Sequence, residues 1–476
     1  MKTNQLLLLF LVLFSFHTLS RGNPEKQQPN FIIIIGDDAT YNDLPLYGGM
    51  NVKTPAIDKL ASEGLVFNKA YVCMAMCAPC RNELYTGLFP LRNGDCWNHS
   101  GVRSDIKSIV QYMDGLGYRV GIAGKIHAKP RSVYSWDLVE GLERNCAIPG
   151  AAYDKAGMLS YMKQNGNQPF CLIVALVVPH VPWTEGDASH FKPDELNLPS
   201  YLADTKETRS DYAKYLAEIE VLDQQVGKTL EALKEAGQEK NTVVIFTSEQ
   251  GSSFPGPKYT NFNTGVHTAF IVRWPGIVEA GKRTDAIIQY ADVLPTLIEV
   301  AGGQVDQSQF DGKIFLPVLK GETDKHREYA YFIHNNIPEG PSYPIRAISD
   351  GKYHYIRNLS PDEIYIEKHI MGTMRYHEFW PSWLYESTNS MQVYNAVKRY
   401  MVRPAEQLFD TEADPNNINN LINDPELEDI KKRLSQKLNE WLIQQGDPGK
   451  VLDTWKVYNA CLNGNHDILK IENPID

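Results

Sequence analysis

The sequence has no second long hydrophobic run. After the apolar stretch 6–16, no segment approaches the roughly 18 apolar residues that a membrane-spanning helix needs. The chain also has no excess of positive charge, since 47 Lys and Arg residues stand against 58 Asp and Glu residues. A net charge of -11 argues against a protein that binds nucleic acid through the phosphate backbone. A local basic pocket for an anionic substrate is still compatible with this charge.

The N-terminus has the pattern of a secretory signal peptide. Lys2 is followed by the short apolar run and then by small and polar residues. The alternative, a buried N-terminal helix, fits the polar stretch 21–30 poorly. No cysteine lies near the end of this segment, so we expect no lipid anchor and no stable membrane anchor. We therefore expect residues 1–22 to be a signal peptide and the mature protein to be periplasmic or secreted.

Cysteine is scarce for an exported chain. Seven cysteines in 476 residues are too few for a disulfide-rich scaffold, and their odd number leaves at least one unpaired. Cys77 and Cys80 form a C-x-x-C pair with three interpretations: a redox disulfide, half of a zinc site, or a structural pair. The sequence has no second C-x-x-C or H-x-x-x-H group to complete a zinc site.

Apolar strands alternate with helices through the first two thirds of the chain. Buried strands are predicted at 30–36, 118–123, 170–178, 242–247 and 268–274, and helices at 106–116 and 208–236. A further helix begins after Thr54, the predicted N-cap, with Pro55 in its first turn. Polar residues follow four of these strands. This pattern predicts an α/β fold with a mostly parallel central sheet flanked by helices and a site at the carboxyl edge.

The pattern changes after about residue 320. Short strands are predicted at 329–334, 345–349 and 353–357, and the last regular element is a helix at 425–445. We therefore expect a catalytic domain at 23–325, because the chain is too long for one compact core. A smaller C-terminal α+β subdomain with an antiparallel sheet would occupy 326–476.

Two adjacent carboxylates, Asp37 and Asp38, end the first strand. Two adjacent carboxylates repel each other, and in an apolar context this is costly unless a cation lies between them. The alternative is a solvated turn or a helix cap.

The run Cys77-Ala78-Pro79-Cys80-Arg81 is followed by Leu84-Tyr85-Thr86-Gly87. C-x-P-C-R with a trailing L-x-T-G resembles the signature of the type I sulfatases, which have an alkaline-phosphatase-like fold. In that family a separate maturase oxidises the first cysteine to formylglycine. The resemblance implies that Cys77 is modified in this way and that the chain hydrolyses sulfate esters. The family usually has serine where this chain has Cys80.

The chemistry of a hydrated aldehyde suits this reaction. One of its two hydroxyls, activated by a metal, attacks sulfur, and the other then loses its proton to expel sulfate. Arg81, one helical turn from Cys77, would steady the diol.

The resemblance also implies the remaining site residues. It assigns Asp37, Asp38, Glu249, Gln250 and the modified Cys77 as metal ligands. In place of Glu249 the family has aspartate, and in place of Gln250 it has asparagine or histidine. Oxygen ligands of this kind favour one calcium ion. The family motifs place Lys125 and Lys258 on sulfate, His127 on the formylglycine and His180 on the leaving oxygen. Each of these four is by itself compatible with a solvated or structural role, and we interpret His267 as structural or at most at the substrate's edge.

The substrate is the least determined feature. The stretch 369–389 is rich in side chains that stack on sugars or bind anions, namely Arg375, Tyr376, His377, Phe379, Trp380, Trp383 and Tyr385. With Trp183 and His334 they favour a carbohydrate sulfate, although a core-packing role is the alternative. Similarity to bacterial polysaccharide sulfatases implies a polymer such as ulvan, carrageenan or a glycosaminoglycan. A phosphonate or phosphodiester hydrolase and a non-catalytic sugar-binding relative are the competing hypotheses.

Overall fold

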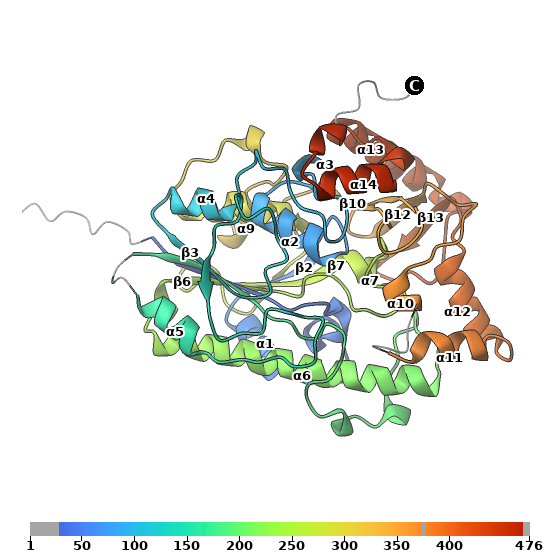
Figure 1. Cartoon of the computed structure of the whole chain (residues 1–476), viewed down its shortest axis with the longest axis horizontal. Coiled ribbons are helices and arrows are strands. Elements are labelled where there is room, and N and C mark those ends of the chain that lie inside the picture. The colour runs from blue at the N-terminus through green and yellow to red at the C-terminus, as the bar shows by residue number, and fades with distance from the viewer. Residues whose placement is uncertain (1–27, 165, 167, 373–376, 470–476) are drawn as a thin grey trace, which may run out of the picture.

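The computed structural model describes residues 28–164, 166, 168–372 and 377–469, so the expected signal peptide lies outside the described residues. A mixed central sheet runs in the order β4-β3-β5-β1-β6-β7-β2-β8, with β9 paired to β2 (Figure 1). Its strands are β1 Asn30–Ile35, β2 Leu65–Tyr71, β3 Arg119–Gly124, β4 Asp137–Val139, β5 Phe170–Ala175, β6 Thr242–Thr247, β7 His267–Arg273, β8 Lys282–Thr284 and β9 Ile288–Gln289. The predicted strands therefore form, β6 with the predicted bounds and the others with somewhat different ends.

The centre of the sheet is parallel. β1 lies between β5 and β6, with Ile33 opposite Ile173 on one side and Ile245 on the other. Every residue of these three strands is buried, as continuous apolar runs predict. Because the strands are in register, the residues that follow them meet at one edge.

β7 is antiparallel to both β6 and β2, unlike its parallel neighbours at the centre. The chain returns from β6 at the same end of the sheet through a loop and the short helix α7, Asn263–Val266. A parallel strand would need a crossover to the opposite end, which this connection does not make.

Helices cover both faces of the central sheet. In Figure 1, α1, α5 and α6 lie on one side and α2, α4 and α9 on the other. The helices of this part are α1 Pro55–Ser62, α2 Cys77–Thr86, α3 Pro90–Asn93, α4 Ile109–Asp114, α5 Ala156–Lys163, α6 Lys206–Glu235, α8 Val293–Val300 and α9 Leu316–Leu319. α1 begins at Pro55 with Thr54 as its N-cap residue, as predicted, although the Thr54 side chain makes no capping hydrogen bond. Asp223 of α6 accepts from the backbone N–H groups of Ala56 and Ile57 instead, at 3.1 and 2.8 Å.

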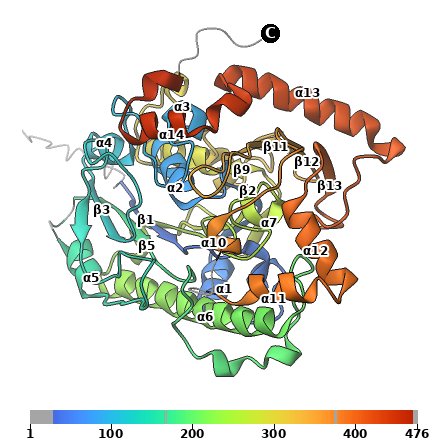
Figure 2. The ribbon, with the colours of Figure 1, turned by 45° about the vertical axis from the view of Figure 1, so that its right-hand side comes forward.

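A second, antiparallel sheet follows in the order β10-β11-β12-β13. Its strands are β10 Ala330–His334, β11 Ile345–Ser349, β12 Tyr353–Asn358 and β13 Glu406–Asp410, and its helices are α10 Lys368–Met371, α11 Phe379–Glu386, α12 Met391–Met401, α13 Glu428–Gln445 and α14 Trp455–Leu462. Arg346 of β11 bonds Asp447, just after α13, at 2.7 and 2.8 Å. The predicted last helix starts later than expected, and it is not the last, because α14 packs beyond it near α3 (Figure 2). None of the helices within the described ranges is long and apolar enough to cross a membrane.

Candidate active site

The polar residues that follow the parallel strands meet at the carboxyl edge of the sheet. Asp37 and Asp38 follow β1, Lys125 follows β3, and Glu249 follows β6. Cys77 is the first residue of α2, with Sγ at 3.8 Å from Oδ1 of Asp37 and 3.7 Å from Oδ1 of Asp38. The expectation of one site built from several strand ends therefore agrees with the geometry.

Three fully buried carboxylates stand around Cys77. Ligand atoms of Asp37, Asp38, Cys77 and Glu249 all lie within 4.8 Å of one another. Carboxylates this close are costly in an apolar interior unless cations compensate them. The oxygen-rich set suits a hard cation such as calcium, with Cys77 adjoining it.

The amide of Gln250 completes the group. Its Nε2 donates to Oδ1 of Asp38 at 2.6 Å, and its Oε1 accepts from Sγ of Cys80 at 3.2 Å. For Gln250 to bind a cation, the amide would turn so that its oxygen faces the carboxylates. All seven cysteines, each within the described ranges, are free, so Cys77 and Cys80 do not form the disulfide of a redox pair.

Three buried cations pair with the three carboxylates. Nζ of Lys125 is 2.6 Å from Asp37, and Nζ of Lys258 is 2.7 Å from Asp38. Nε of Arg81 is 2.5 Å from Oε1 of Glu249. Each carboxylate therefore has a cationic partner, and a divalent cation and a sulfate dianion bound together would add no net charge to the cluster.

His180 lies above Asp38, with Nε2 at 3.6 Å from Oδ2. Burial lowers the pKa of His180, but the nearby Asp38 outweighs burial and raises that pKa well above its ordinary value. Asp38 therefore favours the protonated form of His180. The Cys146 thiol, which sequence analysis did not single out, lies within 4.8 Å of ligand atoms of His180 and Asp37.

Backbone strain is concentrated in this region. Six non-glycine residues of the described chain have a positive φ, and three of them are the predicted site residues Asp38, His127 and Glu249. Two more, His99 and Tyr259, lie beside the site, and only Asn417 lies elsewhere. Such conformations cost roughly 1–3 kcal/mol each and persist where the surrounding structure enforces them.

His127 joins the cluster at its rim rather than its centre. Its Nε2 is 3.1 Å from Nδ1 of His99, and Nε2 of His99 is 3.5 Å from Glu339 of the C-terminal sheet region. Neither His99 nor Glu339 was identified from the sequence, because neither stands directly at the end of a predicted strand or belongs to a quoted motif. The left-handed backbone that marks His99 is visible only in the structure.

The aromatic stretch proposed for sugar binding packs into the core instead. Phe379 and Trp383 are fully buried, and Trp380 is 2% exposed, whereas Tyr385 is 70% exposed. His377 stacks on Phe379, while Arg375 and Tyr376 lie outside the described residues. Trp183 stacks on Phe254 and His334 is fully buried, so neither offers a ring to a sugar. Amphipathic helices bury such rings, and the sequence pattern could not separate this role from a binding loop. His267 is also buried and stacks on Tyr41, as its structural interpretation predicts.

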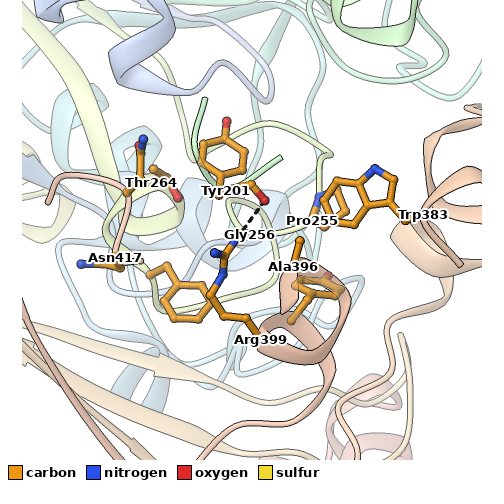
Figure 3. A pocket seen from close by; sticks show the side chains of 11 residues that line it. Tyr201, Pro255, Gly256, Thr264, Trp383, Ala396, Arg399 and Asn417 are labelled. Atoms are coloured by element: carbon orange, nitrogen blue, oxygen red, sulfur yellow. Dashed lines mark hydrogen bonds between the residues drawn. The ribbon is translucent and has the colours of Figure 1, made fainter. Parts of the chain in front are cut away.

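A small cavity lies behind the loop that carries Lys258. Figure 3 shows it between Tyr201 and Gly256 on one side and the α11–α12 region on the other, with Arg399 bonded to the carbonyl of Tyr201 at 3.0 Å. Its volume of about 10 Å³ leaves room for about one water molecule. The cavity is therefore too small for a substrate.

Comparison with known proteins identifies the family. A sequence model of the sulfatase family matches residues 29–303, and a model described as the C-terminal part of N-sulphoglucosamine sulphohydrolase matches 257–367. An ulvan-active sulfatase of Formosa agariphila is 32% identical over 435 residues, or 90% of this chain and 83% of that protein. N-sulphoglucosamine sulphohydrolase of Homo sapiens is 24% identical, covering 90% of this chain and 92% of that protein.

Solved structures share the fold at lower identity. A protein solved with its substrate D-glucosamine-2-N,6-O-disulfate has a TM-score of 0.63 and 20% identity, covering 88% of this chain and 98% of that one. Phosphonate monoester hydrolase of Agrobacterium radiobacter has a TM-score of 0.66 and 19% identity, covering 88% and 96%. At these identities the likeness shows an alkaline-phosphatase-like architecture alone, whereas the sequence matches carry the assignment of activity. The chain therefore belongs to the sulfatase family and is a sulfuric ester hydrolase.

Proposed function

We propose that this sulfatase hydrolyses sulfate esters of a carbohydrate, with a nucleophile made from Cys77 beside one bound calcium ion. The observation that carries the proposal is the position of Cys77. Its side chain enters a buried cluster of three carboxylates and three cations at the carboxyl edge of the sheet. A bare thiol has no evident task there, whereas a group that attacks sulfur would stand among the charges the reaction needs.

Asp37, Asp38, Glu249 and Gln250 would hold the calcium ion, adjoining residue 77. When present, the formylglycine and the ion supply a metal-activated hydroxyl for attack on sulfur. In this structure Lys125 and Lys258 neutralise the two aspartates. When a calcium ion neutralises the aspartates, the two lysines would bind the sulfate oxygens. Arg81 keeps Glu249 in place through the charged bond between them.

His180 is placed to protonate the leaving oxygen. Its raised pKa keeps the proton available at neutral pH, and its side chain is 15% exposed, so it can meet a substrate that enters from solvent. His127, at the rim, would contact the reacting group from the other side.

A sulfated polysaccharide or its oligosaccharides is the substrate class we propose. The 32% identical relative is named as active on ulvan, and another relative is named for N-sulphoglucosamine. Algal polymers such as ulvan or carrageenan, and glycosaminoglycans, are the candidates to test. We also propose that residues 1–22 direct export to the periplasm or medium, and that a formylglycine-generating maturase is a partner.

The modification can be tested directly by mass spectrometry. The tryptic peptide that contains Cys77, purified from a host with the maturase, should be lighter by about 18 Da than the unmodified peptide. Cys77→Ser should abolish sulfate release, because serine lacks the second hydroxyl. Cys80→Ser, which restores the usual family residue, is the matched control and should keep both the mass change and activity. Full activity of an unmodified or Cys77→Ser protein would refute the proposed nucleophile.

Relative rates would separate the competing hydrolase. Sulfate and phosphate-diester substrates that share one leaving group should be compared under the same conditions. We expect faster release from the sulfate ester, and a preference for the phosphodiester would replace the proposed activity. Absence of turnover on both, with intact binding of sulfated oligosaccharides, would favour a sugar-binding relative.

A further inference from the structure

Glu339 and His99 form a line of contacts that ends on His127. Oε1 of Glu339 is 3.5 Å from Nε2 of His99, whose Nδ1 is 3.1 Å from Nε2 of His127. Glu339 follows β10 of the second sheet, whereas the histidines belong to loops of the first. The smaller sheet region thus reaches the candidate active site through two imidazoles.

Glu339 is a firmly held anion. Its carboxylate is fully buried, accepts from Nδ2 of Asn98 at 2.9 Å and contacts Nε2 of His369 at 2.7 Å. Burial would raise the pKa of Glu339, but His369, followed by Lys368 at 3.2 Å, lowers it to about 2. Since it is ionised at neutral pH, this carboxylate only accepts hydrogen bonds.

His127 is neutral in this environment. Burial lowers its pKa well below the ordinary value, and Lys125 adds to the effect. A neutral imidazole has one N–H and one acceptor nitrogen. Nδ1 of His127 is buried and has no hydrogen-bond partner among the described residues. The tautomer therefore decides whether Nδ1 can accept a hydrogen bond or can only donate one.

We infer that Glu339, acting through His99, selects the tautomer of His127 that has its proton on Nε2 and a free acceptor at Nδ1. A carboxylate attracts an N–H and repels a lone pair, so it favours the proton of His99 on Nε2. Nδ1 of His99 is then an acceptor, and the proton between the two rings belongs to His127. The inference rests on the proposed function, in which a hydroxyl at position 77 is the donor that Nδ1 of His127 meets. Glu339 and His99 are positioning residues.

A second contact of His99 favours the other tautomer of this ring. Nδ2 of Asn98 is 3.2 Å from Nε2 of His99, and a hydrogen bond donated by this amide requires a lone pair on Nε2. One hydrogen of the same amide goes to Glu339 at 2.9 Å, and the other has a second acceptor in the hydroxyl of Tyr259 at 3.4 Å, so the amide does not require a lone pair on His99 whereas the charge of Glu339 favours the N–H. The positive φ angles of His99 and His127, 63° and 44°, show that the fold holds the backbone of both residues in place at a conformational cost.

The tautomer can be measured without turnover. Protein labelled with 15N-histidine and produced without the maturase would be studied by long-range 15N–1H NMR correlation, whose pattern differs between the two tautomers. His127→Gln and His99→Gln identify the two rings by the signals they remove. We expect the Nε2–H form at both rings of the wild type. An Nδ1–H form at His127 would overturn the inference, and this result needs no variant at Glu339.

Glu339→Gln then tests the cause. Loss of the charge should populate the second tautomer at His127, whereas Glu367→Gln should leave the pattern unchanged. Glu367 is the matched control because it is also buried in this cluster but caps α10 through backbone N–H groups. In matured enzyme, Glu339→Gln should lower kcat by about tenfold or more with KM nearly unchanged, as loss of a positioned acid–base group does. An unchanged tautomer and kcat would refute the role of Glu339. A wild-type enzyme inactive on all sulfate esters would instead refute the proposed function, leaving the tautomer result intact.

Discussion

At the scale of single residues, the proposed function requires the two lysines of the site to exchange partners. Lys125 and Lys258 each neutralise a buried aspartate, and each is itself nearly inaccessible to solvent. Desolvation lowers the pKa of Lys258, but Asp38 outweighs it and raises the pKa well above the ordinary value. Asp38 therefore keeps Lys258 in its charged form. This charge pairs with Asp38 in the structure and would pair with a bound sulfate in the proposed function.

Lys258→Gln removes one of these charges while keeping a polar side chain. We expect kcat/KM for a sulfated oligosaccharide to fall by roughly a hundredfold, as on loss of one preorganised donor. Product inhibition by free sulfate should weaken in parallel. Lys240→Gln, on an exposed turn, is the control. Steady-state kinetics that show equal values for both variants would exclude Lys258 from sulfate binding.

At the scale of elements, α2 is tied down by one buried carboxylate. Glu83 accepts from the backbone N–H of Cys73 at 2.7 Å and of Ala291 at 3.2 Å, which joins α2 to the segments after β2 and β9. Burial raises the pKa of Glu83 from 4.5 to about 8. The helix that begins with Cys77 is thus positioned by a side chain that is protonated at neutral pH.

This shift predicts a pH dependence of stability. Between pH 4.5 and 8 the unfolded chain releases the proton of Glu83 while the folded chain keeps it, so the free energy of unfolding falls as pH rises. The contribution is at most about 1.4 kcal/mol per pH unit. Glu83→Gln cannot titrate and should show a shallower fall in urea denaturation between pH 5 and 8. Parallel curves for the two proteins would show that Glu83 does not titrate in this range.

Gly124, the last residue of β3, determines how the chain enters the loop that carries Lys125. Gly124 has a φ of 89°, and a Cβ there would lie 2.0 Å from the carbonyl oxygen of Ala175. A side chain would push β3 from β5 and displace Lys125, so the motif requires glycine for a backbone reason. The close approach of Gly124 to β5 depends on the tertiary fold.

At the scale of the whole molecule, the proposed calcium site would link metal binding to folding. The carboxylates come from two distant chain segments, 37–38 and 249, so a cation that binds them all would bind only the folded chain. Calcium at 100 times its Kd would add about 2.7 kcal/mol to the free energy of unfolding. Stability should therefore rise with calcium whether or not Cys77 is modified.

Thermal unfolding with calcium and with a chelator measures this link. We expect a higher Tm with calcium for the wild type and a much smaller increase for Asp38→Asn. Asp105→Asn, at an exposed position, should behave as the wild type does. The same calcium-dependent increase in Asp38→Asn would place the ion elsewhere or show that it does not bind the cluster.

The strand ends and the cysteine motif were predictable because their signals are local. Continuous apolar runs mark buried parallel strands, and parallel strands bring the residues after them to one edge. Asp37, Lys125 and Glu249 met there as expected. The ends of other helices were less well predicted, since α4 covers Ile109–Asp114 of the predicted 106–116 and α13 begins at Glu428 and not at 425.

The amino-acid sequence by itself determined the family, the central sheet and the group of side chains around Cys77, because each follows from local periodicity or from a contiguous motif. Only the tertiary structure decided the antiparallel direction of β7, the burial of the aromatic stretch in α11, and the contact of Glu339 with His99. These features join residues that are far apart in the chain. Their geometry depends on how the two sheets pack, and no local pattern carries that information.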